Sequence, residues 1–257
     1  MAGVNICGLA KIYYIKGAPI SALADVDLDI SDGSFVTVVG KSGCGKSTLL
    51  RLICGLEPMT AGEILFNTEG EFHSRVGARV NMVFQEPRLM PWLTVEQNMA
   101  VALIREKDTQ KSKATVNQFL DMMGLKKFKD AYPSQISGGM AQRVALGRML
   151  CYNPDLILMD EPFGALDAFT RRNLQKLLID IFREQKKTII FVTHDVDEAI
   201  FLGQKVVIIE NGRISRQVLV NLPYPREIAS HAFFQLREDV MATIMHEENI
   251  NIERKFL

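Results

Sequence analysis

The sequence feature that most constrains the fold is a glycine-rich stretch at residues 40–48, GKSGCGKST. It fits the pattern G-x-x-x-x-G-K-[ST] of a phosphate-binding loop. An apolar, β-branched run at 35–39 precedes it, and a run typical of a helix follows from Thr48 and ends at Gly55. In that context glycines let successive backbone N–H groups converge on an anion at the positive end of a helix. A chance glycine turn is the alternative, and the flanking strand and helix argue against it.

Two side chains of this stretch have roles of their own. Lys46 can reach the β- and γ-phosphates of a nucleotide, and the Ser47 hydroxyl can ligate Mg²⁺. The loop as a whole would hold the phosphates. We therefore expect ATP, together with Mg²⁺, to contact Gly40, Lys41, Ser42, Gly43, Cys44, Gly45, Lys46, Ser47 and Thr48.

Buried apolar runs alternate with helical patterns over most of the chain. Such alternation implies an α/β fold with a parallel sheet covered on both faces. A mostly helical stretch at about 86–154 interrupts it, and we interpret this stretch as a helical subdomain inserted into the α/β core. Within it, Thr94 is the expected N-cap of a helical segment at 94–123. The apolar runs lie at 35–39, 79–85, 156–159 and 189–193, and the other helical patterns at 137–152, 167–185 and 195–202.

The two ends of the chain break the α/β pattern. Apolar and acidic residues alternate at 25–30, and Ser31-Asp32-Gly33 favours a tight reversal, so we expect an antiparallel β start. Asn211-Gly212 predicts a second hairpin, across 206–218. Two prolines, at 223 and 225, then mark a boundary. We predict a nucleotide-binding domain at 1–220 and a helical tail at 221–257, with the tail helix at 226–248.

Charge and hydropathy argue against several classes of protein. Thirty basic residues balance thirty acidic ones among 257, so the chain carries no basic field for nucleic acid. No apolar run approaches the ~18 residues of a membrane span, and the first residues lack the pattern of a secretory signal. The four cysteines show no C-x-x-C spacing. We therefore expect neither disulfides nor a zinc site, and a reducing, cytoplasmic environment.

Polar side chains follow the apolar runs at the strand ends where α/β folds bind their ligands. Asp160 is placed to hold Mg²⁺, and Glu161 to act as general base on the attacking water. His194 could contact the γ-phosphate and orient that water, and the Gln85 amide could contact both the metal ion and the water. Each alone is also consistent with an ordinary polar strand end. The expected catalytic residues are Lys46, Gln85, Glu161 and His194, and the expected metal ligands are Ser47, Gln85 and Asp160.

A second anion site is indicated at Ser137-Gly138-Gly139. A hydroxyl and two permissive glycines stand there at the predicted start of a helix, where backbone N–H groups are unpaired. No lysine accompanies them, so this site would bind phosphate weakly by itself. The alternative is a plain serine N-cap followed by a glycine turn.

Together these segments resemble the ATP-binding cassette (ABC) family in order and spacing across residues 1–220. Ile136 and Met140 depart from the commonest signature, L-S-G-G-Q, but its Ser-Gly-Gly is intact. The resemblance places an adenine-stacking aromatic at Tyr13, with Tyr14 as the alternative register and ordinary strand packing as the alternative role. The matching segments are a Walker A loop at 40–48, a Q-loop glutamine at Gln85, the signature at 136–140, a Walker B strand at 156–161, a D-loop at 164–167 and a switch histidine at His194.

The resemblance also implies partners. ABC cassettes work as head-to-tail dimers, so Ser137-Gly138-Gly139 of one copy would close the ATP held by Lys46 of a second copy. Integral-membrane permease subunits and a separate solute-binding protein would complete the assembly, with this chain peripheral on the cytoplasmic face of the inner membrane. A narrower resemblance, to the nitrate, sulfonate and taurine importer ATPases, rests on VFQEPRLMPWLTV at 83–95 and LPYPR at 222–226. Import is expected because exporters of this family commonly fuse the cassette to membrane spans.

Two other functions stay open at this point. One is a cytosolic ABC ATPase acting on nucleic acid or ribosomes, although such proteins usually carry two cassettes or a coiled-coil insertion. The other is a nucleotide-sensing subunit without turnover, which would lack the general base. For the importer, we hypothesise that Glu86 to Leu93 docks on the permease, because this loop carries several large apolar side chains, among them Trp92. The alternative is that Trp92 packs under the helical subdomain.

Overall fold

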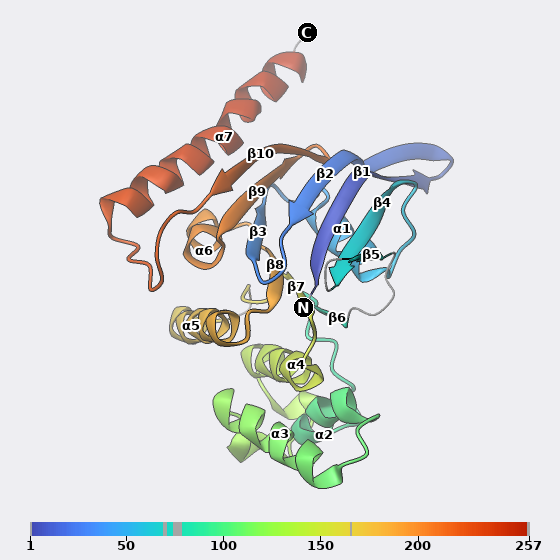
Figure 1. Ribbon diagram of the computed structural model, residues 1–257, viewed down its shortest axis with the longest axis vertical. Coiled ribbons are helices and arrows are strands. Elements are labelled where there is room, and N and C mark those ends of the chain that lie inside the picture. The colour runs from blue at the N-terminus through green and yellow to red at the C-terminus, as the bar shows by residue number, and fades with distance from the viewer. Residues whose placement is uncertain (1, 69–70, 74–78, 165, 256–257) are drawn as a thin grey trace.

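The fold is built on two β-sheets, which the computed structural model shows for residues 2–68, 71–73, 79–164 and 166–255 (Figure 1). The larger sheet has the strand order β10-β9-β3-β8-β7-β6, and the smaller the order β2-β1-β4-β5. In the larger sheet β9, β3, β8, β7 and β6 run parallel, and β10 is antiparallel to β9. Its strands are β3 (Phe35–Val39), β6 (Val80–Val83), β7 (Leu156–Asp160), β8 (Thr188–Val192), β9 (Lys205–Glu210) and β10 (Arg213–Leu219). This confirms the predicted α/β class.

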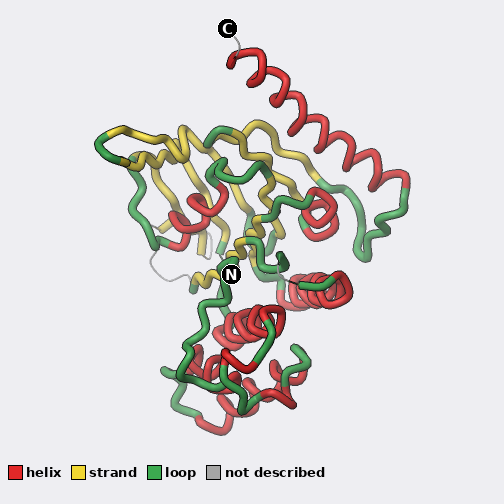
Figure 2. The backbone as a smooth tube through the Cα atoms, turned by 180° about the vertical axis from the view of Figure 1, so that it is seen from behind, coloured by secondary structure: helices red, strands yellow, loops and turns green. Residues whose placement is uncertain are grey.

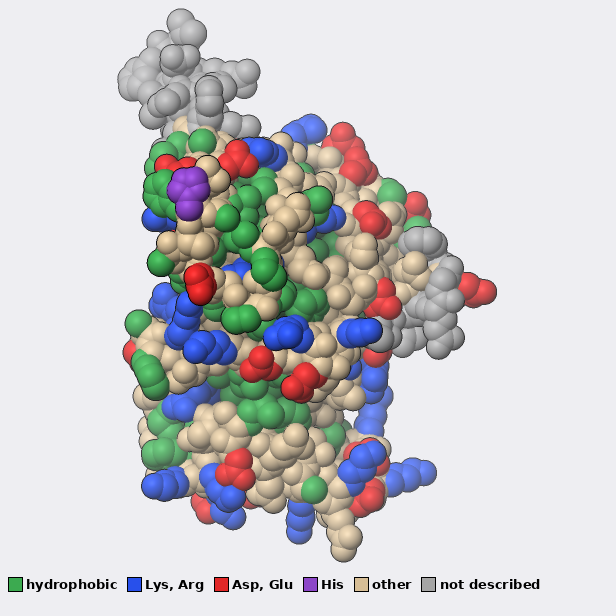
Figure 3. All heavy atoms as spheres, turned by 60° about the vertical axis from the view of Figure 1, so that its left-hand side comes forward, with side chains coloured by type: hydrophobic (Ala, Val, Ile, Leu, Met, Phe, Trp, Pro, Cys, Tyr) green, Lys and Arg blue, Asp and Glu red, His purple; other side chains and the backbone are tan. Residues whose placement is uncertain are grey.

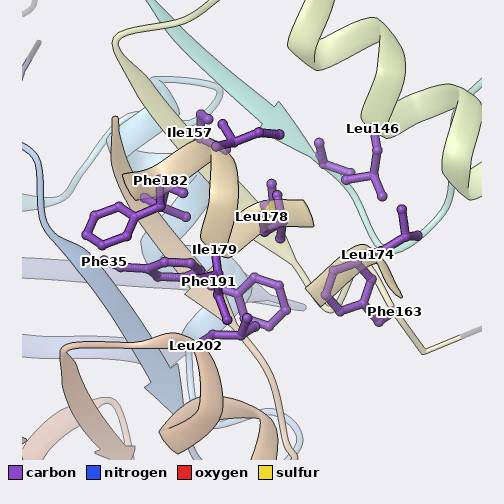
Figure 4. Packing of buried hydrophobic residues seen from close by; sticks show 14 of the residues in the cluster. Phe35, Leu146, Ile157, Phe163, Leu174, Leu178, Ile179, Phe182, Phe191 and Leu202 are labelled. Carbon is purple, nitrogen blue, oxygen red and sulfur yellow. The ribbon is translucent and has the colours of Figure 1, made fainter. Parts of the chain in front are cut away.

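Side chains of the larger sheet alternate between two hydrophobic cores. In β3, Phe35 and Val39 belong to one core, and Val36 and Val38 to the other. All five residues of β3, β7 and β8 are buried, as expected for strands covered on both faces. On the first face, the Phe35 ring meets Phe182 edge-on at 5.5 Å between ring centroids (Figure 4). The sheet therefore holds the strand ends in fixed positions.

The second core joins the larger sheet to the smaller, antiparallel one. Its strands are β1 (Gly3–Ile15), β2 (Ala18–Ile30), β4 (Ala61–Thr68) and β5 (Glu71–His73). The antiparallel start is confirmed, but the predicted reversal at Ser31-Asp32-Gly33 is wrong as a hairpin. A turn does form there, with the Ser34 N–H donating to the Ser31 carbonyl at 3.2 Å. It passes the chain from one sheet to the other, because β2 pairs with β1 while β3 pairs with β8 and β9.

The helices lie in three places. α1 (Lys46–Cys54) lies on the side of the second core, and α5 (Ala168–Gln185) and α6 (Val196–Leu202) on the side of the first. The helical elements between β6 and β7 lie together below the sheets (Figures 1 and 2). They are α2 (Val95–Ala100), η1 (Val101–Leu103), α3 (Thr109–Met122), η2 (Lys126–Phe128), η3 (Pro133–Gln135) and α4 (Gly138–Tyr152). The division into an inserted subdomain and a core remains a prediction.

The expected helical segment at 94–123 is broken in the structure. Thr94 is the N-cap of α2, as predicted, and forms a capping box with Gln97. The chain then leaves the helix, and α3 starts afresh after Asp108, whose side chain accepts from the Lys111 N–H at 2.9 Å. Asp108 is a strong N-cap residue, so it fixes where the second helix begins.

The C-terminal helix begins later than predicted. α7 spans His231–Lys255, because residues just before it hold the end of α6 instead of forming a helix. The buried Arg226 guanidinium donates to the carbonyls of Gly203 at 2.6 Å and of Ile200, and the Tyr224 hydroxyl donates to the Leu202 carbonyl. Carbonyls at a helix C-terminus have no partner within the helix, so these side chains supply one. None of the described helices is both long enough and apolar enough to cross a membrane.

Candidate functional site

The glycine loop lies where the sequence pattern places it, between β3 and the start of α1. Two of its glycines cannot be replaced without a clash. A Cβ atom on Gly40 would lie 2.1 Å from the Ile209 carbonyl oxygen, and one on Gly45 would lie 2.5 Å from the Ala22 carbonyl oxygen. Both residues also have positive φ angles, 154° and 108°, which side chains disfavour. The close approach of the loop to its neighbours therefore requires glycine at both positions.

Lys46 is the first residue of α1, and its side chain folds back over the loop. Its Nζ donates to the carbonyls of Gly40 at 2.7 Å and Lys41 at 2.9 Å, and the side chain is buried. The ammonium is thus pre-positioned beside the N–H groups that converge at the start of the helix. A cation held in a partly dehydrated loop is suited to a polyphosphate.

A cavity of about 330 Å³ opens over this loop and is lined by all four predicted catalytic residues. Beside it lies a second cavity of about 390 Å³, lined in part by Lys41 and Cys44. Burial raises the pKa of the Cys44 thiol, which keeps it protonated. The first cavity is lined by Ala22, Ser42, Gly43, Gly45, Lys46, Ser47, Thr48, Gln85, Glu161 and His194. Side chains from β6, β7, β8 and the loop therefore meet at one edge of the sheet.

Ser47 and Asp160 form the candidate metal site. The Ser47 hydroxyl donates to Asp160 Oδ1 at 2.9 Å. Burial raises the pKa of the Asp160 carboxyl, and Glu161 adds to this, while the Ser47 hydrogen bond and the charges of Arg51 and Lys46 oppose it. Within the described residues there is no cluster of three or more His, Cys, Asp or Glu side chains. Two oxygen ligands nevertheless fit Mg²⁺, which usually takes one or two protein ligands and completes its shell with phosphates and water.

Glu161 and His194 face each other beside the metal ligands. His194 Nδ1 lies 3.0 Å from Glu161 Oε2. The Glu161 backbone has φ 44°, a left-handed conformation that is uncommon for a non-glycine residue and is found at sites where the surrounding structure enforces it. The Glu161 N–H donates to the Val192 carbonyl at 3.0 Å. This hydrogen bond holds the Glu161 backbone, and with it the position of the side chain, against the neighbouring strand β8.

A buried network behind His194 was not foreseen from the sequence. Glu198 on α6 accepts from the Thr193 hydroxyl at 2.6 Å and from Gln175 Nε2 at 2.9 Å. Burial raises the pKa of the Glu198 carboxyl, and both hydrogen bonds oppose the shift. These bonds fix the end of β8 that carries His194. The sequence offered one signal for this network: Gln175 and Glu198 are polar residues on the inward faces of two predicted helices.

Some predicted site residues lie elsewhere. Ser137 is the N-cap of α4 and accepts from the Met140 N–H at 3.2 Å. Neither Ser137 nor the two glycines after it line either cavity over the loop, so within one chain they do not reach the Lys46 site. In the predicted D-loop, Asp167 caps α5, while Ala165 lies outside the described residues.

Tyr13 is half-buried next to α1 and lines neither cavity over the loop. Its hydroxyl donates to the Glu57 carboxylate, and the Lys11 ammonium lies 4.9 Å from its ring centroid. Tyr14 is 73% exposed near the tip of the β1–β2 hairpin. The adenine-stacking role of Tyr13 stays a prediction, and Glu57, which orients the ring, was not foreseen.

Comparisons with known proteins agree with this geometry. A family model described as "ABC transporter" matches residues 23–164. The aliphatic sulfonates import ATP-binding protein of Bacillus cereus is 44% identical over 240 residues, which are 93% of this chain and 94% of that protein. The nitrate import ATP-binding protein of Synechocystis is 41% identical, over 92% of this chain and 89% of that protein. A solved dimeric ATP-binding cassette, in a post-hydrolysis state with ADP and Pi, is 31% identical with a TM-score of 0.78, covering 85% of this chain and 99% of that one.

Proposed function

Because the chain belongs to the ABC transporter family of ATP-binding subunits, we propose that it drives the import of a small anionic solute through separate permease subunits. The chain binds and hydrolyses ATP, as members of this family do. The observation that carries the proposal is the meeting of Lys46, Gln85, Glu161 and His194 around one cavity at the carboxyl edge of the sheet. In α/β folds this edge is where ligands bind.

Each of these side chains has a step to perform. Lys46 and the loop N–H groups bind the phosphates and offset their charge. Ser47 and Asp160 would hold Mg²⁺, which supplies Lewis-acid stabilisation of the phosphoryl oxygens. Glu161 accepts the proton of the attacking water, and His194 holds the Glu161 carboxylate at 3.0 Å in the orientation that this transfer needs. Gln85, exposed at the rim of the cavity, can contact the water or the metal ion.

A second copy of the chain supplies the missing side of the site. Ser137, Gly138 and Gly139 begin α4 away from their own Lys46, and Ser137 and Gly138 are exposed. An anion site without a lysine gains its function when it closes on phosphates already bound by another subunit. The dimeric arrangement named for the solved cassette supports a homodimer here.

The solute class follows from the relatives. Proteins named for aliphatic sulfonates and for nitrate both match this chain over most of its length, and both solutes are small anions. We infer a solute of that class, delivered by a separate solute-binding protein, and a peripheral place for this chain on the cytoplasmic face of the inner membrane. Nothing favours the nucleic-acid alternative: basic and acidic side chains lie interspersed on the face in Figure 3, and the whole chain is neutral.

The loop at 86–93 is suited to dock on the permease. Trp92 is 71% exposed, so its alternative role in the core is wrong. The buried Asn98 holds the loop around it: Asn98 Oδ1 accepts from the Met90 N–H at 2.8 Å, and Asn98 Nδ2 donates to the carbonyls of Met90 at 3.1 Å and Leu93 at 3.0 Å. Arg148 donates to the carbonyls at 87 and 88. A large apolar side chain displayed on a rigid loop is typical of a protein interface.

We expect Trp92→Ala to leave the melting temperature and the basal ATPase rate unchanged, because an exposed ring contributes little to the core. Permease association and ATP-dependent solute uptake into reconstituted vesicles should be lost. Leu219→Ala is the matched control, since Leu219 is also largely exposed but lies on β10. A variant that melts much earlier yet still binds the permease when folded would contradict the docking role.

Tyr13→Ala should raise the ATP dissociation constant while leaving the maximal rate largely intact. Stacking of a base on an aromatic ring is worth about 1–3 kcal/mol by alanine substitution, and it acts on the bound substrate as much as on the transition state. Equilibrium ATP binding and steady-state kinetics measure the two effects. The neighbour Tyr14→Ala serves as control, and an effect in Tyr14→Ala alone would shift the assignment by one residue.

The import proposal is tested by reconstitution. The chain, its permease subunits and a solute-binding protein in vesicles should take up an organic sulfonate or nitrate only when ATP is supplied on the cassette side. If the purified chain hydrolyses ATP but neither binds a permease nor supports uptake, the importer role is wrong while the ATPase assignment stands.

A further inference from the structure

Three neighbouring strands run from the catalytic edge to a third cavity, which lies at their opposite ends. β6, β7 and β8 are parallel and adjacent. At their carboxyl ends stand Gln85, Glu161 and His194. Arg79 and Lys187, which directly precede β6 and β8, line a cavity of about 610 Å³. This cavity is larger than either of the two over the glycine loop.

Apolar side chains form one part of the cavity wall. They come from four elements: Leu103 from η1, Phe119 from α3, Leu150 from the end of α4, and Ile157 from β7. Leu150 and Ile157 are buried, and Leu103 and Phe119 are partly buried against the same core. A concave site with an apolar wall is the usual setting for a small organic ligand.

Among the charged residues of the remaining wall, cations outnumber anions. Arg79, Lys111 and Lys187 line the cavity, and Glu106 is the acidic residue among the lining side chains. Arg79 is held in place by Asp155, with Nη2 lying 3.3 Å from Oδ1 and Nε lying 3.3 Å from Oδ2. The lining side chains alone therefore carry an excess of positive charge, which favours anions.

Lys187 is the most informative of the three cations. It is buried, and no hydrogen bond or ion pair ties it to any other residue in the part of the chain that the structure describes. Burial lowers the pKa of its ammonium, the nearby Arg79 charge adds to that shift, and the Asp155 charge opposes it. The Lys187 ammonium thus has no bonded partner among the described side chains, so it can donate to an anion held in the cavity.

We propose that this cavity is a second ligand site, which binds a small amphiphilic anion: a sulfonate or carboxylate head on a short hydrocarbon chain. The head lies among Lys187, Lys111 and Arg79, and the chain against Phe119, Leu150 and Ile157. The occupant is linked to the catalytic edge through β6, β7 and β8, so it changes the affinity for ATP. This linkage rests on the proposed function of the catalytic edge, whereas binding itself does not.

Binding is tested on the full chain by isothermal titration calorimetry, with 1-butanesulfonate as probe. We expect saturable binding of one molecule per chain. Sulfate lacks the hydrocarbon chain and so loses the apolar contacts, whereas butylammonium reverses the charge and so loses the charge-assisted contact. Each should bind more weakly by about tenfold or more. Equal binding of all three probes, or no binding of 1-butanesulfonate, would overturn the site.

Variants locate the site. Lys187→Met removes the charge and keeps most of the stem, and it should weaken binding by about tenfold or more. Lys111→Met should weaken it less, since Lys111 is exposed, and its matched control is Lys113→Met, two residues along α3 and outside the cavity lining. Thr115→Trp fills the cavity without changing its charge and should abolish binding, so the site can be tested even if Lys187→Met does not fold. Unchanged binding in Thr115→Trp would refute the assignment.

The linkage has its own readout. ATP affinity is measured in Glu161→Gln, to avoid turnover, with and without saturating 1-butanesulfonate. By thermodynamic reciprocity, the factor by which the anion changes ATP affinity must equal the factor by which ATP changes anion affinity. Equal, non-unit factors support the linkage. Unchanged ATP affinity would refute it and leave the ligand site standing, and a chain that binds the anion but no ATP at all would instead refute the proposed function.

Discussion

Replacing Lys46 by alanine should abolish ATP binding and hydrolysis at any practical nucleotide concentration. The Lys46 ammonium is buried, and it already lies within hydrogen-bonding distance of two carbonyls of the glycine loop. In the ATP complex it offsets the charge of the β- and γ-phosphates in a site from which water is largely excluded. Alanine leaves the loop N–H groups but removes the cation that stands at the first position of α1. Equilibrium nucleotide binding and steady-state turnover measure the two losses.

The control for Lys46→Ala is thermal unfolding. Lys46 bonds to two carbonyls, of which that of Gly40 is buried and that of the exposed Lys41 can be solvated after the substitution, so the melting temperature should fall only modestly. Lys113→Ala, on the exposed surface of α3, should leave both nucleotide binding and turnover unchanged. A folded Lys46→Ala protein with near-normal affinity and turnover would contradict the assignment of the glycine loop.

Replacing Glu161 by glutamine should preserve ATP binding and slow turnover by about 10²–10⁴-fold, the usual worth of a general base. Glutamine has almost the same shape and can still accept a hydrogen bond from His194, but it cannot take a proton from water. ATP should then persist between two subunits, so a dimer that depends on ATP should be visible by gel filtration. Single-turnover hydrolysis measures the chemical step directly.

Glu184→Gln is the matched control for Glu161→Gln. Glu184 is an exposed residue on α5, so the same change in charge and shape should leave turnover unaltered. Near-normal hydrolysis by Glu161→Gln would show that another group takes the proton. A variant that lost both ATP binding and turnover would instead indicate that Glu161 maintains the fold of the site.

Local patterns in the sequence predicted which side chains gather around the glycine loop. The glycine loop, its flanking strand and its helix are adjacent in the chain, so their arrangement needs no long-range information. Asp160 and Glu161 are far from His194 in sequence, but both places lie at the end of a buried strand, and the carboxyl ends of parallel strands meet at one edge. Fold class and the gathering of these residues therefore followed from strand direction alone.

The features that the sequence did not reveal depend on tertiary contacts. The turn after β2 has the composition of a hairpin, but which strands pair is decided by the cores on either side of the sheet. Arg226 reads as a surface residue, yet its guanidinium is buried against the end of α6. Glu198 likewise has the composition of a surface residue but is buried. A buried carboxylate is rare unless it is paired, and the partners of Glu198 come from the end of β8 and from α5. No pattern within one segment reports such partners.

The position of β3 in its sheet has a consequence for how the protein is made. β3 carries the glycine loop, and its hydrogen-bonded neighbours are β8 and β9, with Phe35 opposite Ile189 and Val36 opposite Lys205. Both neighbours are synthesised more than 150 residues after β3. A ribosome adds about 5–20 residues per second, so the first part of the chain must wait for its partners, and such distant pairings are slow to form. The nucleotide site therefore cannot assemble until synthesis is well advanced, and a chain truncated before β8 would have the whole glycine loop without either of the strands that flank β3 in the sheet.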